Sequence, residues 1–271
     1  YGGSCSSSTT SATTDNNTIT LVSLSDDTYS DCTITVTDNA SNGVTLNISS
    51  FVVDTTAPTV SSVSSSTDND SYKINGNITV TVTFNENVIV DNSSGNPRIQ
   101  LETGTNDRYA NYVSGNSTSI LSFLYTVQSG DNTTDLDYTS TSSLSANNGT
   151  IQDNATNNAN LTLLAPGSSG SLGANKDIVV DTTAPTVSSV STTADNQSSV
   201  SITDNITVTF SEAMDNTTVT TNTDNTSCSG TIGVSSDNFS NCVQMSSAPA
   251  SSSDNMTFTL NPSDNLTGGT T

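Results

Sequence analysis

The 271-residue chain has no histidine, no tryptophan, four Lys or Arg, and only 5% aromatic residues. Histidine is the commonest acid/base group and metal ligand, so its absence argues against most hydrolase and zinc chemistry. The 26 acidic residues set a formal net charge of −22. A surface of that charge repels nucleic acid and anionic lipid and attracts cations. We therefore expect no nucleic-acid partner.

Long hydrophobic runs are also missing, since only 31% of the chain is hydrophobic. No apolar stretch approaches the ~18–20 residues that a membrane-spanning helix needs, so we expect no membrane insertion. Strong helix formers are scarce, whereas Ser, Thr, Asn and Asp abound. The composition therefore argues against a helical protein.

Low hydrophobicity with high net charge is typical of disorder, but the patterning indicates strands. Apolar residues alternate with Thr in four segments, at 32–37, 78–84, 206–210 and 256–260. Such strands suit sheets with one buried and one solvated face. We predict an all-β protein with a small core and a very polar surface.

An internal repeat divides the chain. Residues 52–64, VVDTTAPTVSSVS, recur unchanged at 179–191, and the spacing is about that of one β-sandwich domain. We place domain boundaries near residues 54 and 181. Residues 55–181 are then a complete domain, 1–54 the C-terminal part of one, and 182–271 the N-terminal part of another. The expected strands of the complete domain, residues 55–181, are 59–63, 77–84, 97–102, 109–113, 119–127, 149–152, 160–164 and 177–181.

Three sequence features resemble the bacterial Ig-like domains that repeat in large secreted adhesins and biofilm or surface-fibre proteins. They are the VVDTTAPTV boundary, a strand followed by Phe-x-Glu, and Asp-x-x-x-Asn at 38–42 and 153–157. The resemblance implies tandem Ig-like β-sandwiches, one complete and two partial, that act as spacers and not as an enzyme.

The four cysteines fall into two local pairs, Cys5 with Cys32 and Cys228 with Cys242. Three connectivities are possible, and the domain division favours these two bridges. The alternative of two metal half-sites lacks Cys-x-x-Cys spacing and any histidine. Disulfides indicate an exported protein, extracellular or on the cell surface.

Asn-x-Ser/Thr sequons are frequent, which is either an effect of composition or the mark of a glycoprotein with sugars on its solvent faces. They begin at Asn16, Asn39, Asn47, Asn69, Asn77, Asn92, Asn116, Asn132, Asn148, Asn154, Asn160, Asn196, Asn205, Asn216, Asn225, Asn238, Asn255 and Asn265.

One end of an Ig-type middle domain would gather three carboxylates. Asp54 precedes its first strand, Glu86 lies in the loop after strand 77–84, and Asp153 lies in the loop before the last strands. Converging carboxylates suit Ca²⁺, which takes 6–8 oxygen ligands. Asp181 and Glu212 repeat this pattern at the next boundary, with the third carboxylate beyond residue 271 or in a neighbour. The alternative is a set of solvated acidic loops.

Catalytic carboxylates are a weaker interpretation. Asp135 and Asp137 alternate along one segment, as a glycosidase pair could. A sugar cleft also needs aromatic residues, which are few here, and a solvated strand edge explains the pair more simply.

We predict a structural subunit of an extracellular filament or surface fibre, assembled head to tail, with glycans and structural Ca²⁺. The two partial domains have two interpretations: the chain is cut from a longer repetitive protein, or neighbouring copies complete each other by exchanged strands. The expected partners are other copies and carbohydrate or cell-surface contacts. The alternative is a spacer in a long monomeric cell-surface adhesin that binds its target elsewhere.

Overall fold

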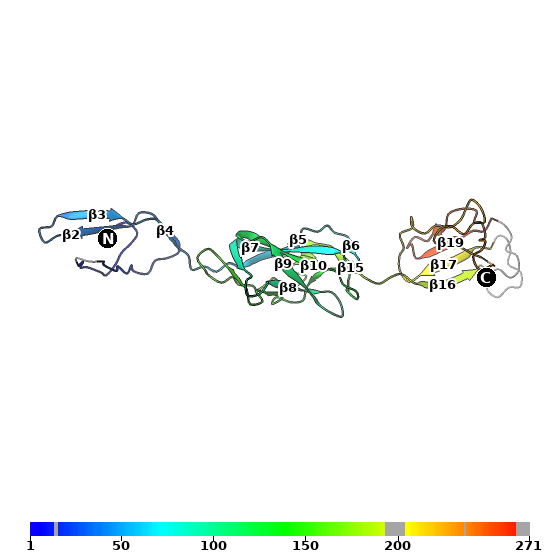
Figure 1. Ribbon diagram of the computed structural model, residues 1–271, viewed down its shortest axis with the longest axis horizontal. Coiled ribbons are helices and arrows are strands. Elements are labelled where there is room, and N and C mark those ends of the chain that lie inside the picture. The colour runs from blue at the N-terminus through cyan, green and yellow to red at the C-terminus, as the bar shows by residue number, and fades with distance from the viewer. Residues whose placement is uncertain (14–15, 193–203, 236, 264–271) are drawn as a thin grey trace. The chain divides into compact units, whose positions relative to one another are not determined.

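The computed structural model describes residues 1–13, 16–192, 204–235 and 237–263. The chain divides into two compact units, Tyr1–Thr182 and Thr183–Thr271. Apart from one helical turn, all regular secondary structure in the described residues is β-strand, which confirms the predicted all-β fold class (Figure 1). The one described helix, α1 (Leu172–Asn175), is a single turn and far too short to cross a membrane. Residues 1–54 belong to the first compact unit, so the division into three domains stays a prediction.

The middle of the chain contains two sheets. The larger has the strand order β12-β8-β9-β10-β7-β14, with β5 added on β7 and β13 on β8, and the smaller has the order β11-β15-β6. Their bounds are β5 (Val60–Ser65), β6 (Ser71–Tyr72), β7 (Asn77–Asp91), β8 (Arg98–Glu102), β9 (Arg108–Ser114), β10 (Thr118–Thr126), β11 (Asn132–Thr133), β12 (Asp137–Tyr138), β13 (Leu144–Ser145), β14 (Thr150–Gln152) and β15 (Val179–Asp181).

Strict alternation in β7 builds the core of the middle region. Ile78, Val80 and Val82 are fully buried, while the Thr residues between them stay half-buried on the other face. The facing strand β10 places Phe123 opposite Val80, and the Phe123 ring packs edge-on against Tyr112 with centroids 6.0 Å apart. The aromatic stretch of β10 is therefore a core strand.

A buried polar network around Asp131 lies beside this core. The Asp131 carboxylate is fully buried and accepts hydrogen bonds from the Tyr125 hydroxyl (2.6 Å), the Arg108 Nε (2.8 Å) and the Gln128 amide (2.9 Å). Burial and the bond to Asp131 raise the pKa of Tyr125. Because all three donors converge on one carboxylate, Asp131 is satisfied despite its burial.

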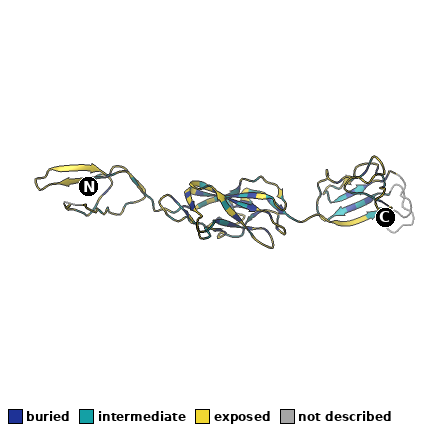
Figure 2. Ribbon diagram, viewed as in Figure 1, coloured by how far each residue is buried: buried dark blue, intermediate teal, exposed yellow. Residues whose placement is uncertain are grey.

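The described part of residues 1–54 contains the short strands β1 (Asp27–Tyr29), β2 (Thr33–Thr37), β3 (Gly43–Asn47) and β4 (Phe51–Val53). β1 pairs with β4, and β2 pairs with β3 as a separate hairpin. The small core contains Tyr29 and the bridged Cys5 and Cys32, whereas the hairpin is mostly exposed (Figure 2).

The described residues of the second unit form a four-stranded sheet of order β16-β17-β19-β18. Its strands are β16 (Val187–Thr192), β17 (Ile206–Phe210), β18 (Ala250–Ser251) and β19 (Thr257–Leu260). A small core cluster joins Ile206, Val208, Met245 and Leu260.

One expected strand is not formed. Residues 160–164 contribute only an isolated parallel bridge, between Asn160 and Thr59. The Thr162 amide donates to the Asn160 side chain at 3.0 Å, and the Leu163 amide donates to the Thr141 carbonyl at 2.8 Å. Because these amides bond elsewhere, residues 160–164 do not continue the ladder along β5.

Candidate functional site

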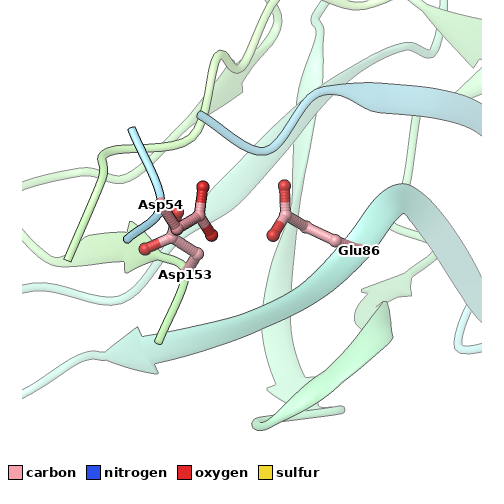
Figure 3. A group of neighbouring side chains, drawn as sticks. All are labelled: Asp54, Glu86 and Asp153. Carbon is pink, nitrogen blue, oxygen red and sulfur yellow. The ribbon is translucent and has the colours of Figure 1, made fainter. Parts of the chain in front are cut away.

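The structure brings Asp54, Glu86 and Asp153 together at one end of the middle region. One carboxylate oxygen of each lies within 4.8 Å of the others, and Figure 3 shows Asp54 and Asp153 side by side with Glu86 facing them. Among the described residues, no other group of three such side chains lies this close. This arrangement has the oxygen donors that Ca²⁺ prefers, and calcium binding itself stays a prediction.

Asp153 is held by a tight loop after β14. Its Oδ1 accepts a hydrogen bond from the Asn157 amide (2.8 Å) and its Oδ2 accepts one from the Asn157 side chain (2.7 Å). Thr156 adopts φ 73° inside this loop. The same Asn157 Nδ2 also donates to the Asp54 carbonyl (3.0 Å), so one amide ties the Asp153 loop to the residue before the linker.

Glu86 lies within a strand and not in the expected loop. The pairing of β7 with β10 shifts register between Thr83 and Val88, so Glu86 sits at an irregularity inside the long β7. β7 continues because its last residues, Ile89–Asp91, pair with β14. The strand therefore extends beyond the end that alternation alone predicts.

The electrostatics of the cluster favour a bound cation or proton. Burial, and then the charges of Asp54 and Asp153, raise the pKa of Glu86. Asp54 is half-buried, and its Oδ1 accepts a bond from the Thr56 amide at 3.0 Å. Three carboxylates this close repel one another when all are ionised, and a divalent cation would remove that repulsion.

The two residues of the second predicted acidic site belong to different compact units. Asp181 is the last residue of β15 in the first unit, opposite Asn132 of β11, and is half-buried. Glu212 follows β17 in the second unit, and its Oε1 is buried without a hydrogen-bond partner.

The Asp-x-x-x-Asn loop that holds Asp153 occurs at further places in the chain, and the sequence analysis did not identify all of them. The loop at Asp38 repeats the Asp153 geometry, with the Asn42 amide (2.8 Å) and Asn42 side chain (2.9 Å) on its carboxylate. A third copy, Asp237 with Asn241 at 2.9 and 2.8 Å, was missed, although the Asp-x-x-x-Asn spacing was visible. The role of Asn157 at the Asp54 carbonyl has no local sequence signal.

The predicted disulfides form. Cys5 is bonded to Cys32 and Cys228 to Cys242, with Cα separations of 5.2 and 5.0 Å. Both lie in the range that a disulfide requires. No free cysteine remains.

The sequon asparagines lie on the surface. Each described one is exposed except Asn205 and Asn255, which are half-buried, and Asn196 and Asn265 lie outside the described residues. Exposure permits glycosylation without demonstrating it.

Backbone amides bind the carboxylate of Asp137 in the Asp135–Asp137 pair. Asp137 accepts hydrogen bonds from the Tyr138 and Gly167 amides, each at 2.9 Å. The pKa of Asp135 is raised by partial burial and by the charges of Asp137 and Asp177. These contacts give Asp137 a structural role in positioning the 167 loop.

A comparison with known protein families finds a match in the C-terminal part of the chain. Residues 181–271 match the family model described as bacterial Ig-like domain, a family of non-catalytic structural domains. No curated protein and no solved structure matches the chain. Since residues 179–191 repeat 52–64, the match begins at the second copy of the repeat. The chain is therefore similar to a bacterial Ig-like domain over residues 181–271, consistent with a bacterial Ig-like repeat domain.

Proposed function

We propose that this chain is a structural subunit of an extracellular filament or surface fibre, in which Ig-like domains joined by proline-containing linkers provide length. The observation that carries this proposal is the repeated boundary itself: the same linker, followed by the same strand pair, starts both the middle region and the second unit. A bacterial Ig-like domain indicates a surface-protein segment, and the two disulfides fit an extracellular or surface location.

Electron microscopy of native material tests this function. Regular fibres with a repeat of two or three domains would support the filament. Isolated flexible strings would instead favour the alternative, a spacer within a long monomeric adhesin. Soluble, unattached monomers would contradict both.

Structural Ca²⁺ is the second part of the proposal, and the Asp54–Glu86–Asp153 cluster supports it. Asp54 directly precedes the Thr55–Pro58 linker, so a cation held there would stiffen the start of the middle region. We expect Glu86→Ala to make this linker more sensitive to protease in calcium, to the level that chelator produces in the unmodified chain. Glu102→Ala, at an exposed glutamate outside the cluster, is the control. Equal cleavage with and without chelator would contradict a calcium role.

Glycans on the exposed sequons are the third part. The surface placement of these asparagines supports it, and mass spectrometry of native material tests it. We expect occupied sites such as Asn92 and Asn116 and unmodified Asn205 and Asn255. Detection of no sugar on any sequon peptide would assign the sequons to composition.

A further inference from the structure

Asn-Gly dipeptides are chemically labile positions in a protein, and the chain contains three of them. They are Asn42–Gly43, Asn75–Gly76 and Asn148–Gly149. The labile step is attack of the glycine amide nitrogen on the asparagine side-chain carbon Cγ, which glycine permits because it has no side chain to obstruct the approach. An amide whose N–H is hydrogen-bonded inside a rigid turn cannot make this attack. The surroundings of the three glycine amides therefore decide which asparagine reacts.

The Asn75–Gly76 turn is fixed to the core of the middle region. The Gly76 amide donates to the Lys73 carbonyl at 2.8 Å, and the Gly76 carbonyl accepts from the Val127 amide at 2.8 Å. The Asn75 amide donates to the Val127 carbonyl at 2.9 Å, and Val127 is buried. Attack by the Gly76 nitrogen would require these bonds to break together.

The Asn148–Gly149 turn is also fixed. The Gly149 amide donates to the Ala146 carbonyl at 2.9 Å. The turn is packed closely, since a Cβ on Gly149 would lie 2.4 Å from the Gly95 carbonyl oxygen. It connects β13 with β14, which pair with β8 and β7 of the large sheet. The Gly149 nitrogen is therefore held in a hydrogen bond by the main fold.

The Gly43 amide has a different environment. The Asp38 amide donates to the Asn42 carbonyl at 2.9 Å, so these two residues form a hydrogen-bonded pair of the antiparallel hairpin. Bonded and non-bonded pairs alternate along such a ladder, and Thr37–Gly43 is the next pair. The Gly43 N–H therefore points away from β2. In the described part of the chain β3 pairs with β2 alone, and both Asn42 and Gly43 are exposed.

The hairpin that carries Asn42 also has little to keep it closed. Val36, Val44 and Leu46 are 44%, 57% and 61% exposed, so β2 and β3 pack on each other and not on a core. Few buried apolar contacts lower the free energy of local opening. The Asn42 side chain then turns until its Cγ meets the Gly43 nitrogen.

We propose that Asn42 is a site of spontaneous deamidation and that the fold protects Asn75 and Asn148. The Gly43 nitrogen gives its proton to water and bonds to the Asn42 Cγ. The Cγ–Nδ2 bond then breaks, ammonia takes up a proton and leaves, and a five-membered succinimide remains. Water opens either carbonyl of this ring and leaves aspartate or isoaspartate at position 42. The net reaction consumes one water and releases one ammonia.

The reaction removes a hydrogen bond that shapes the Asp38 loop. The Asn42 Nδ2 donates to the Asp38 Oδ2 at 2.9 Å, and deamidation replaces this donor with a second carboxylate that repels the first. In the equivalent loops after β14 and before Cys242, the asparagine is followed by Asn158 and Cys242, which obstruct the attack. The modification therefore acts on the Asp38 loop among these three, and it is independent of the proposed filament.

Peptide mass spectrometry of the folded chain tests the proposal. The chain is incubated at mildly alkaline pH in water enriched in heavy oxygen, which labels each newly formed carboxylate. We expect label at position 42 to appear at least about tenfold faster than at Asn75 or Asn148, because only the hairpin opens easily. Fragmentation should identify both aspartate and isoaspartate there, the two products that a succinimide gives.

Two controls separate the fold from the local sequence. Gly43→Ala places a methyl group 3.1 Å from the Thr37 Cγ2, which a small shift of that side chain relieves, and should slow labelling at position 42. Circular dichroism would verify that this variant keeps the fold. In guanidinium with the disulfides reduced, all three sites should react at similar rates, because the turns that protect Asn75 and Asn148 are gone.

The contrary results are equally definite. Equal labelling of the three sites in the folded chain, or no labelling of position 42, would overturn the proposal. A Gly43→Ala variant that reacts as fast as the unmodified chain would exclude the succinimide route. The same preference for position 42 in the unfolded chain would show that the fold protects neither Asn75 nor Asn148.

Discussion

The middle region and the second unit start from the same sequence and arrive at different cores. In the middle region, β5 lies over a large apolar cluster that extends from Val63 to Val180. In the described part of the second unit, the equivalent strand lies beside a smaller cluster that contains Ile206, Val208, Met245 and Leu260, and its own valines remain exposed. The comparison teaches that local sequence reproduces strand, register and bulge, whereas burial depends on residues far along the chain.

The largest effect should come from the central aromatic of each core. Phe123 and Phe258 are fully buried and face Val80 and Val208 in equivalent strand pairs. Either change to Ala should lower the free energy of unfolding of its own unit by roughly 3–5 kcal/mol. Two-transition denaturation would measure this, and equal shifts of both transitions would show that the units do not unfold separately.

The repeated strands allow a matched pair of smaller substitutions. Val63→Ala removes buried methyl groups and should cost about 2 kcal/mol. Val190→Ala, at the identical position of the repeat, should cost under about 0.5 kcal/mol in the monomer, because the side chain is exposed. A cost at Val190 equal to that at Val63 in dilute monomer would mean that β16 is already covered.

A further comparison concerns the position opposite the first isoleucine of each equivalent strand, which is polar in one core and apolar in the other. Tyr125 lies opposite Ile78, and its counterpart opposite Ile206 is Leu260, which cannot bond a carboxylate. Tyr125→Phe removes one of the donors to buried Asp131 and should cost about 1–3 kcal/mol. The reverse change, Leu260→Tyr, should also destabilise, because the described core cluster around it is apolar. Urea denaturation measures both, and an unchanged midpoint for Tyr125→Phe would mean that the Asp131 network adds no stability.

The smallest effect is a pH dependence at Glu86. Its raised pKa means that the folded state binds the proton more tightly than the unfolded chain. Its contribution to stability is therefore present below the ordinary Glu pKa and is lost as pH rises through the raised pKa of the folded state. In chelator, Glu86→Gln should raise the urea midpoint at neutral pH and leave it unchanged in acid.

Added Ca²⁺ sharpens that measurement. With calcium, the unmodified chain should regain the stability that Glu86→Gln otherwise supplies, and the variant should respond less. Glu102→Gln serves as the control. A midpoint for Glu86→Gln that equals the unmodified chain at every pH would show that the carboxylate repulsion has no effect on stability.

The candidate site was predictable to the extent that topology brings strand ends together. Asp54 and Asp153 were expected at one end of the sandwich because Ig-type connectivity places the first strand and the last loop there. Glu86 was expected in a loop because alternation ends at Phe84, yet the pairing of Ile89–Asp91 with β14 keeps it inside a strand. The bond from Asn157 to Asp54 joins residues distant in the chain, and no local pattern marks it.

The sequence by itself determined the all-β class, the repeated boundary, the two disulfides and the alternation that selects which face of β7 is buried. These follow from residue types and short-range spacing, because side-chain direction in a strand has a period of two. Tertiary structure alone decided that Val63 is covered and Val190 is not, that residues 160–164 bridge instead of pairing, and that Glu86 meets Asp54 and Asp153 from within a strand and not from a loop. Each of these depends on which distant segment reaches a given edge or face, and that is a property of the whole fold.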